Sequence, residues 1–266
     1  MAVHARTRLV PGFQVGSSIV HWRNCNYGYG QVMSMSRTVA NDALGWDVHN
    51  WYRALAFVDA RLESDWLRGK RGLELGAGFN GGLSLWLALR GVRMTCSGCH
   101  PSFDDVSDVT KEIHRKYRLS DVIYERVDAT RIPYTGSFDI VAFRSVIGGI
   151  SRSADIETAR GVVQQAEAAL RPGGKLIMLE NLAATPLHRY LRQRYGSGAH
   201  GWQYYSIGEF LSLLEGFHGV SYMATGFLGC FGRTERQRSL LGWIDGGLDS
   251  LIPSRWNYIV AIIAQK

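Results

Sequence analysis

The pentapeptide Cys-Ser-Gly-Cys-His, which begins at Cys96, places two thiols and an imidazole at a spacing that could bind a metal or a haem. Cys96, Cys99 and His100 match the C-x-x-C-H pattern of haem attachment, while C-x-x-C alone is half of a zinc site or a redox pair. The two remaining cysteines are isolated, so a zinc site would lack ligands. Haem attachment generally requires export, and no apolar run near the N-terminus has the form of a signal peptide. We therefore predict no metal and no haem here, and another constraint must explain the stretch.

The composition is that of a globular protein with a modest excess of positive charge. The 266 residues are 46% hydrophobic and 20% charged, with a net charge of +7. No stretch approaches the roughly 18 apolar residues of a spanning helix, so we expect no membrane span and a cytoplasmic, reduced protein. The charge fits an acidic small substrate, a phosphate-bearing lipid or RNA equally well.

The elements that must position chemically active residues alternate between strands and helices. The predicted central strands are 73–75, 92–98, 138–146 and 175–181. Strands that alternate with helices predict an α/β fold with a parallel, doubly wound sheet. Residues 1–35 are expected to be irregular or a lid, and residues 41–64 to be helical. Ser206 and Glu209 predict a capping box at the start of a helix over 206–217.

A glycine-containing loop follows the first of these strands. Glu74 precedes Gly76 and Gly78 there, and an apolar helix follows. Gly76 permits a tight turn, Gly78 lets the backbone approach a ligand closely, and the N-terminus of the helix offers free N–H groups. The glycines alone would also suit a nicotinamide-binding protein.

Together with later motifs, this loop resembles that of the class I S-adenosylmethionine-dependent methyltransferases, which carry E/D-x-G-x-G after the first strand. Asp128 and Ala129 match the Asp and small residue that follow the third strand in this family. Phe-Asp-Ile-Val at 138–141 matches the fourth strand, and Leu-Arg-Pro-Gly-Gly-Lys-Leu at 170–176 matches the entry to the fifth. The order and spacing of the motifs agree over residues 70–181.

The resemblance implies both a fold and a cofactor. The expected fold is a doubly wound, mostly parallel sheet of seven strands, the Rossmann-like methyltransferase fold. It would occupy residues 70–266, after an N-terminal lid and helix over residues 1–69. S-adenosylmethionine is the implied cofactor, and methyl transfer is the implied reaction.

The resemblance also assigns residues to the cofactor. They are Glu74, Gly76, Ala77, Gly78, Gly81, Gly98, Asp128, Ala129 and Arg144. Glu74 would order the glycine loop, Asp128 would accept a hydrogen bond from the adenine amino group, and Arg144 would lie where the methionine end and the substrate meet. For these three side chains a purely structural role stays open: loop ordering, capping of a strand end, and a salt bridge.

Two departures from the family pattern fall in the same predicted pocket. Asn80 stands where a third glycine is common, and two glycines follow, so the loop could be one residue longer. The acid that ends the second strand in the family and bonds the ribose hydroxyls aligns with Gly98, which has no side chain. The opening pentapeptide is therefore predicted to be the ribose corner of the pocket, with His100, Ser97 or water in place of the carboxylate. The departure keeps a non-catalytic cofactor-binding protein as an alternative.

Methylation of a sugar or other aliphatic hydroxyl is greatly helped by a general base. The loop after the fifth predicted strand should border the pocket, because open α/β sheets bind ligands at the carboxyl ends of their strands. It supplies His188 and Glu180 as candidate catalytic residues, with His188 preferred. His49 and His200 are rivals.

The expected acceptor is a small molecule or glycan, with an anionic acceptor as one possibility. Arg189, Arg192 and Arg194 lie close together, which suits a phosphate or a carboxylate but equally a solvated basic face. N- or C-methylation of a small molecule is the alternative reaction. Nucleic acid is not the expected partner, since no RNA-binding domain is appended, and nothing indicates the oligomeric state.

Overall fold

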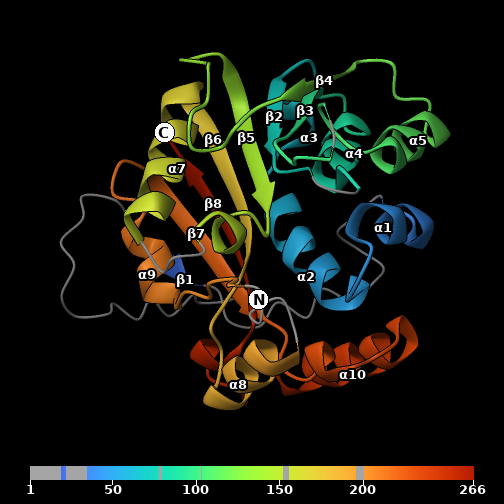
Figure 1. Ribbon diagram of the computed structural model, residues 1–266, viewed down its shortest axis with the longest axis vertical. Helices are drawn as coiled ribbons and strands as arrows, with labels where there is room; N and C mark the ends of the chain where they lie inside the picture. Colours follow the sequence, from blue (N-terminus) through green and yellow to red (C-terminus); the bar gives the residue numbers. More distant parts are fainter. Residues whose placement is uncertain (1–18, 22–34, 78–79, 103, 152–155, 196–200) are drawn as a thin grey trace, which may run out of the picture.

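A single eight-stranded sheet forms the centre of the computed structural model (Figure 1), which describes residues 19–21, 35–77, 80–102, 104–151, 156–195 and 201–266. The spatial order of the strands is β1-β7-β8-β6-β5-β2-β3-β4. The strands are β1 Val20–His21, β2 Arg71–Leu75, β3 Arg93–Gly98, β4 Val122–Arg126, β5 Phe138–Arg144, β6 Leu170–Asn181, β7 His218–Thr225 and β8 Ile259–Gln265. Only β8 runs antiparallel to its neighbours, β6 and β7. The prediction of a doubly wound, mostly parallel sheet is confirmed, and the two-residue β1 adds an eighth strand at the edge next to β7.

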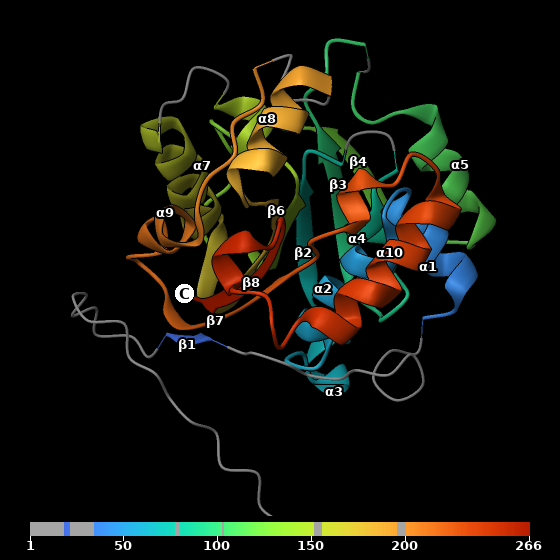
Figure 2. The ribbon, with the colours of Figure 1, turned by 90° about the horizontal axis from the view of Figure 1, so that it is seen from below.

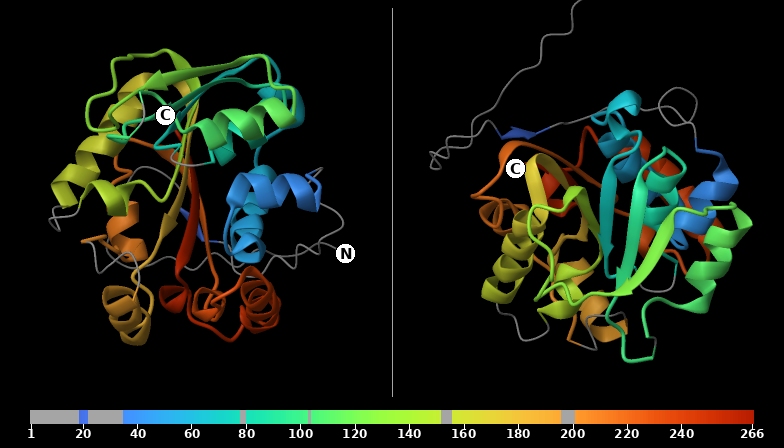
Figure 3. Two further views of the ribbon diagram at one scale, coloured as in Figure 1. Left: turned by 45° about the vertical axis from the view of Figure 1, so that its right-hand side comes forward. Right: turned by 90° about the horizontal axis from the view of Figure 1, so that it is seen from above.

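Helices cover both faces of the sheet. They are α1 Arg37–Leu44, α2 Val48–Asp59, α3 Ser64–Leu67, α4 Gly82–Ala88, α5 Asp108–Lys116, α6 Ile147–Ile150, α7 Ile156–Ala169, α8 Pro186–Tyr195, α9 Ile207–Ser212 and α10 Glu235–Leu248, with the 3-10 turns η2 Gly229–Phe231 and η3 Ser254–Trp256. The left view of Figure 3 shows α7 and α9 on one side of the sheet and α1 and α2 on the other. Each side has its own apolar core.

The predicted helix over 41–64 is divided into α1, α2 and the short α3. Gly45 ends α1 with a φ of 75°, and Asp47 begins α2 with a φ of 45°. A left-handed backbone at these positions cannot continue a right-handed helix. The predicted capping box is confirmed, because Ser206 and Glu209 cap α9, although that helix ends earlier than expected.

The lid predicted over residues 1–35 lies mostly outside the described residues, and helix α2, which follows it, belongs to the main core. Trp51 and Phe57 of this helix are fully buried, in the same apolar cluster as Ile259 and Ala261 of β8. The boundary between residues 69 and 70 stays a prediction. No helix among the described residues is both long enough and apolar enough to cross a bilayer.

The carboxyl ends of the parallel strands meet at one edge of the sheet, and two helices lie beyond that edge. Helix α8 follows β6 and α10 follows β7, and both lie below the sheet in Figure 1. This edge is where open α/β sheets place their ligands.

Candidate functional site

The glycine turn after β2 is built as the sequence motif predicts. Gly76 has a φ of 63°, in the left-handed region that favours glycine, and a Cβ there would lie 2.5 Å from Cγ2 of Val146. The backbone N–H of Ala77 donates to the carbonyl of Ser97 at 2.8 Å, which fixes the turn against β3. Gly78 and its predicted contact lie outside the described residues.

Glu74 orders the loop from within. Its side chain is buried, and its two oxygens accept hydrogen bonds from the N–H groups of Leu83 and Ser84 at 3.2 and 2.6 Å. These are unsatisfied donors of the first turn of α4, where the helix dipole favours a negative charge. Glu74 thus holds the start of α4 against the end of β2, which agrees with the loop-ordering role expected for it.

The glycines after the loop are needed for packing between helices. A Cβ on Gly81 would lie 2.5 Å from Cγ2 of Thr110 in α5, and a Cβ on Gly82 would lie 1.7 Å from the carbonyl oxygen of Ala43 in α1. The carbonyl of Gly81 also bonds the imidazole of His114 at 3.0 Å. This packing explains Gly81 without a ligand, so its contact with a cofactor stays a prediction.

The Cys-Ser-Gly-Cys-His segment lies at the carboxyl end of β3, as predicted. Cys96 is buried and Cys99 is exposed, and the described residues contain no group of three metal-ligating side chains. Ser97 is buried and donates to the carbonyl of Glu74 at 2.6 Å, so its hydroxyl is already used inside the sheet. The exposed His100 stays the candidate for the ribose corner.

Gly98 has a steric reason to lack a carboxylate. A Cβ at this position would lie 2.9 Å from the backbone oxygen of Asp105, a separation that real Cβ atoms do not adopt without displacement of the backbone. The chain after β3 therefore passes over the position where the family carries its acid. Any contact of Gly98 with the ribose would come from its backbone.

Asp128 presents a fixed carboxylate two residues after β4. Its side chain is exposed, and Oδ1 accepts hydrogen bonds from both the N–H and the hydroxyl of Thr130, each at 2.8 Å. Such an Asx turn orients the carboxylate without burying it. The neighbouring Ala129 is buried. Gly76 and Asp128 thus follow β2 and β4, and Gly98 ends β3, the strand between them.

Arg144 joins the loop to the N-terminal helix. Its guanidinium donates to the carbonyl of Leu44 at 2.7 Å and to Oδ1 of Asn80 at 3.2 Å, and it lies over the ring of Trp51. Asn80 in turn donates to the carbonyl of Ala43 at 3.2 Å. Burial lowers the pKa of Arg144 to about 10, so it stays charged at neutral pH. Asn80, the departure from the glycine pattern, therefore acts with Arg144 to hold the C-terminal end of α1.

Glu180 lies at the carboxyl end of β6 beside the glycine turn. It is 1% exposed, and its Oε1 accepts from the N–H groups of Val146 and Ile147 at 2.7 and 3.0 Å. The side chain of Val146 is the one that approaches Gly76. Burial raises the pKa of Glu180 to about 7, although the backbone donors oppose that shift. A carboxylate with a pKa near neutrality is suited to proton transfer.

His188 is placed as a structural residue. It is 1% exposed, and its Nδ1 and Nε2 bond the hydroxyl of Thr185 at 2.6 Å and the carbonyl of Phe227 at 2.7 Å. The rings of Phe227, Phe231 and Tyr258 pack around it. Because the Phe227 carbonyl accepts from Nε2–H, the Nδ1 lone pair is left to accept from Thr185, and neither nitrogen is free to take a proton from a substrate. This geometry does not favour the expected role of His188 as the base.

The other predicted side chains that the structure describes lie on α2 and α8. His49 lines a cavity of about 270 Å³ between α1, α2 and α10, and burial lowers its pKa to about 4. Arg192 of α8 donates to the carbonyl of Leu182 at 2.7 Å, whereas Arg189 and Arg194 are exposed. His200 lies outside the described residues.

A tryptophan that sequence reasoning missed packs on the helix after β5. A Cβ on Gly148 would lie 2.1 Å from Nε1 of Trp202, and one on Gly149 would lie 2.9 Å from the same indole. Both glycines belong to α6, whose first N–H groups Glu180 holds. The paired glycines after a strand were the only signal in the sequence.

Comparisons with known proteins agree with this arrangement. The family described as "Methyltransferase domain" matches residues 73–178, and no curated protein matches the chain. A phosphoethanolamine N-methyltransferase of Haemonchus contortus, solved with phosphomonomethylethanolamine and S-adenosylhomocysteine, is 17% identical with a TM-score of 0.51. The match covers 81% of this chain and 52% of that one, so this chain spans about half of its length.

Two further solved structures match more of their own length. One, described as a sarcosine dimethylglycine methyltransferase of Galdieria sulphuraria, is 18% identical with a TM-score of 0.53, over 81% of this chain and 86% of that one. The other, a methyltransferase in complex with the Haloferax volcanii Trm112 activator, is 16% identical with a TM-score of 0.55, over 88% and 99%. At these identities the likeness is one of fold.

Proposed function

We propose, from the premise that this chain belongs to the class I S-adenosylmethionine-dependent methyltransferases, that it methylates a hydroxyl oxygen of a small-molecule or glycan acceptor, such as a sugar. The observation that carries this proposal is Glu180. A hydroxyl is a weak nucleophile at neutral pH, and its methylation needs a base. Glu180 supplies a carboxylate with a pKa of about 7 next to the glycine turn.

The residues at the carboxyl edge fit the cofactor. S-adenosylmethionine, when bound, supplies an activated methyl group on a sulfonium sulfur. Gly76 and Ala77 would hold its amino-acid part through the backbone, and Asp128 would accept the adenine amino group through a carboxylate that Thr130 fixes in place. Gly98 leaves the ribose without a side-chain carboxylate, so His100 or water would bond it there.

The chain's own residues would then organise the acceptor. Glu180 would take the proton of the acceptor hydroxyl as the new bond forms. Arg144 and Asn80 hold α1 over the loop, which would exclude water from the reacting atoms. Trp202, on the glycine face of α6, offers an indole against which a sugar ring could stack.

N-methylation of a small molecule is the second candidate, because the Haemonchus contortus structure is named for that reaction. An amine is already nucleophilic once it is deprotonated, so it depends less on a base supplied by the protein.

The two reactions are separated by labelled methyl transfer to panels of hydroxyl and amine acceptors, with the native chain and Glu180→Gln. Hydroxyl acceptors should be labelled by the native chain and not by Glu180→Gln. Labelled amines and an unaffected Glu180→Gln would favour N-methylation. If no acceptor is labelled while the cofactor still binds, the chain would be a non-catalytic binding protein.

A further inference from the structure

Helix α10 leaves two large apolar side chains exposed, whereas its other large apolar side chains, Leu241, Ile244 and Leu248, are half-buried. Its buried residues are Gly242 and Asp245, whereas Leu240 and Trp243 on the opposite side are 63% and 71% exposed. Leu251, just after the helix, is 77% exposed. A helix that only covered the core would turn its large apolar residues inward. The apolar side of α10 therefore has no partner within the described chain.

The neighbouring helix α8 continues this surface. Among the described residues thirteen large apolar side chains are exposed, and eight of them lie in α8, η2, α10, η3 and the residues just after α10: Leu187, Tyr190, Tyr195, Phe231, Leu240, Trp243, Leu251 and Trp256. His188 of α8 packs on Phe231, with ring centroids 4.7 Å apart. Phe231 and Leu240 line one open cavity of about 490 Å³, so the surface runs from α8 to α10. Figure 2 shows both helices on the same side of the molecule, and we call this the α8–α10 face.

Charge on this face is segregated. Five exposed arginines surround the apolar side chains: Arg189, Arg194, Arg233, Arg236 and Arg255. Helix α8 contains no acidic residue. The acids of the α10 region have partners within the protein: the half-exposed Glu235 accepts the N–H groups of Asp47 and Val48, Asp245 is fully buried, and Asp249 pairs with Arg53.

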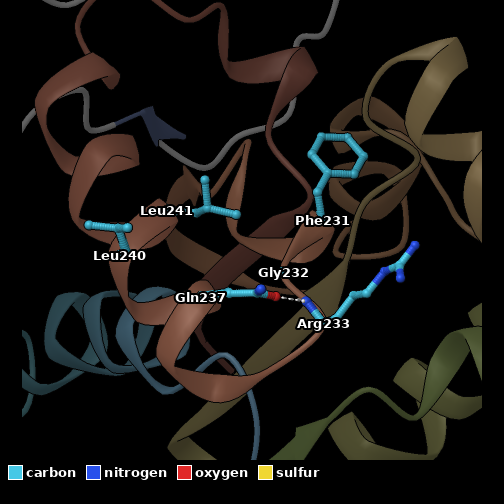
Figure 4. Close-up of a pocket in the computed structure, with 6 residues that line it drawn as sticks. All are labelled: Phe231, Gly232, Arg233, Gln237, Leu240 and Leu241. Atoms are coloured by element: carbon cyan, nitrogen blue, oxygen red, sulfur yellow. Dashed lines mark hydrogen bonds between the residues drawn. The ribbon is translucent and has the colours of Figure 1, made fainter.

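Figure 4 shows the apolar and basic residues that line the cavity of about 490 Å³. Phe231, Leu240 and Leu241 supply the apolar lining, while the side chain of Arg233 extends away from them at the rim. Gln237 has a structural role, because its Oε1 accepts the N–H of Arg233 at 2.9 Å and so caps the start of α10.

We propose that the α8–α10 face docks on an anionic phospholipid bilayer. Tryptophan, phenylalanine and leucine beside arginine are the residues with which interfacial helices enter the headgroup region, and the arginines would meet lipid phosphates. This inference does not depend on which acceptor is methylated. Because the face lies at the carboxyl edge of the sheet, docking would bring the candidate site close to the bilayer.

Charge complementarity argues against the other occupants. A second copy related by a twofold axis would set arginines opposite arginines. The chain's own first residues are no better, since no acidic residue precedes Asp42. Nucleic acid would satisfy the arginines but would gain nothing from exposed Leu187, Leu240 and Leu251.

The test is flotation of the full chain with vesicles of phosphatidylcholine alone or with phosphatidylglycerol added. The native chain should bind the anionic vesicles and not the neutral ones, and salt should weaken that binding. Arg233→Gln with Arg236→Gln should lower the partition coefficient about fivefold for each arginine removed. Leu240→Ser with Trp243→Ser should lower it about tenfold or more.

Leu89→Ser with Ile123→Ser is the matched control, because both side chains are exposed and lie outside the face. It should bind as the native chain does, and thermal unfolding should show all variants folded. Equal binding to both vesicles, or no effect of either double change, would overturn the proposal. So would a native dimer that Leu240→Ser with Trp243→Ser dissociates, or RNA binding that only the arginines support.

Discussion

Glu180 and His188, the two candidate bases, are equally buried but differ in their hydrogen-bonding partners. Glu180 has one oxygen held by backbone donors, and burial raises its pKa to about 7. Burial lowers the pKa of His188, so its imidazole is neutral at neutral pH. Both of its ring nitrogens are hydrogen-bonded to protein groups. At the scale of the residue, the carboxylate is therefore the better proton acceptor.

We predict that turnover on a hydroxyl acceptor rises with pH through about 7, because Glu180 must be ionised to act as base. Glu180→Gln keeps an oxygen for the Val146 and Ile147 donors, so folding should survive. It should lower turnover by about 10²–10⁴-fold and remove the rise with pH. The measurement is initial rate against pH at saturating cofactor. A loss of that size in a folded His188→Gln, with Glu180→Gln near normal, would return the role to the histidine.

Sequence patterns could identify these residues but not their surroundings. Glu74 near the end of β2, Gly76 just after it and Asp128 after β4 have fixed positions relative to their strands, so the sequence motif alone could place them. The burial of His188 depends on Phe227, Phe231 and other rings distant in sequence. The spacing of residues near His188 in the sequence does not encode such tertiary contacts. The sequence therefore could not show that His188, predicted as the base, would be buried among aromatic rings.

At the scale of elements, α1 is fixed to the cofactor loop by a small number of polar contacts. Arg144 reaches the last carbonyl of α1, and Asn80 reaches the one before it. From the sequence motif alone, Asn80 is a departure from the glycine pattern and Arg144 is a residue that contacts the cofactor. The structure shows that they bond each other, which the sequence could not reveal because α1 is far from both.

We predict that Arg144→Met loosens α1 and weakens cofactor binding. The change removes charged hydrogen bonds to Leu44 and Asn80, which are worth about 1.5–3 kcal/mol. Hydrogen exchange should speed up selectively in α1, and calorimetry should show reduced affinity for S-adenosylmethionine. Arg61→Met is the control, since Arg61 donates to the carbonyl of Phe57 within its own segment. If the rate of hydrogen exchange in α1 is the same in Arg144→Met as in the native chain, Arg144 does not hold α1 in place.

At the scale of the whole molecule, the alternation of strands and helices was enough to predict the sheet and its mostly parallel order. Helix α10 was missed because Leu240 and Trp243 face outward while the fully buried positions are Gly242 and Asp245, so its apolar residues do not form one buried stripe. The break at Gly45 was missed because a glycine within an amphipathic run is also tolerated in helices.

A buried polar network joins α2 to α10 and to the residue before β8. Asp47 accepts hydrogen bonds from the hydroxyl of Tyr258 and the amide of Asn50, and that amide also bonds Asp245. Burial raises the pKa of Asp47 to about 7 from its ordinary 3.8. The folded protein therefore holds this proton more tightly than the unfolded chain does. Its contribution to stability is complete below the unfolded pKa and is lost as pH rises through about 7.

We predict that the free energy of unfolding falls between about pH 6 and about pH 8, with Asp47 contributing on the order of 1 kcal/mol. The raised pKa of Glu180 also makes the free energy of unfolding fall as the pH rises through about 7. Asp47→Asn should remove its share of this slope, whatever it does to absolute stability. Urea unfolding across this range measures the slope, with the exposed Asp121→Asn as control. An Asp47→Asn slope equal to the native one would contradict the assignment.

The most direct test of the proposed cofactor site is calorimetric titration of S-adenosylmethionine into the native chain, Asp128→Ala and Asp121→Ala. The adenine amino group is proposed to donate to Asp128, whose carboxylate is exposed and fixed by Thr130. The native chain and Asp121→Ala should bind with equal affinity, and Asp128→Ala should bind about tenfold to a hundredfold more weakly, as expected for a lost bond to a charged acceptor. Absence of binding to the native chain, or equal affinity for all three proteins, would contradict it.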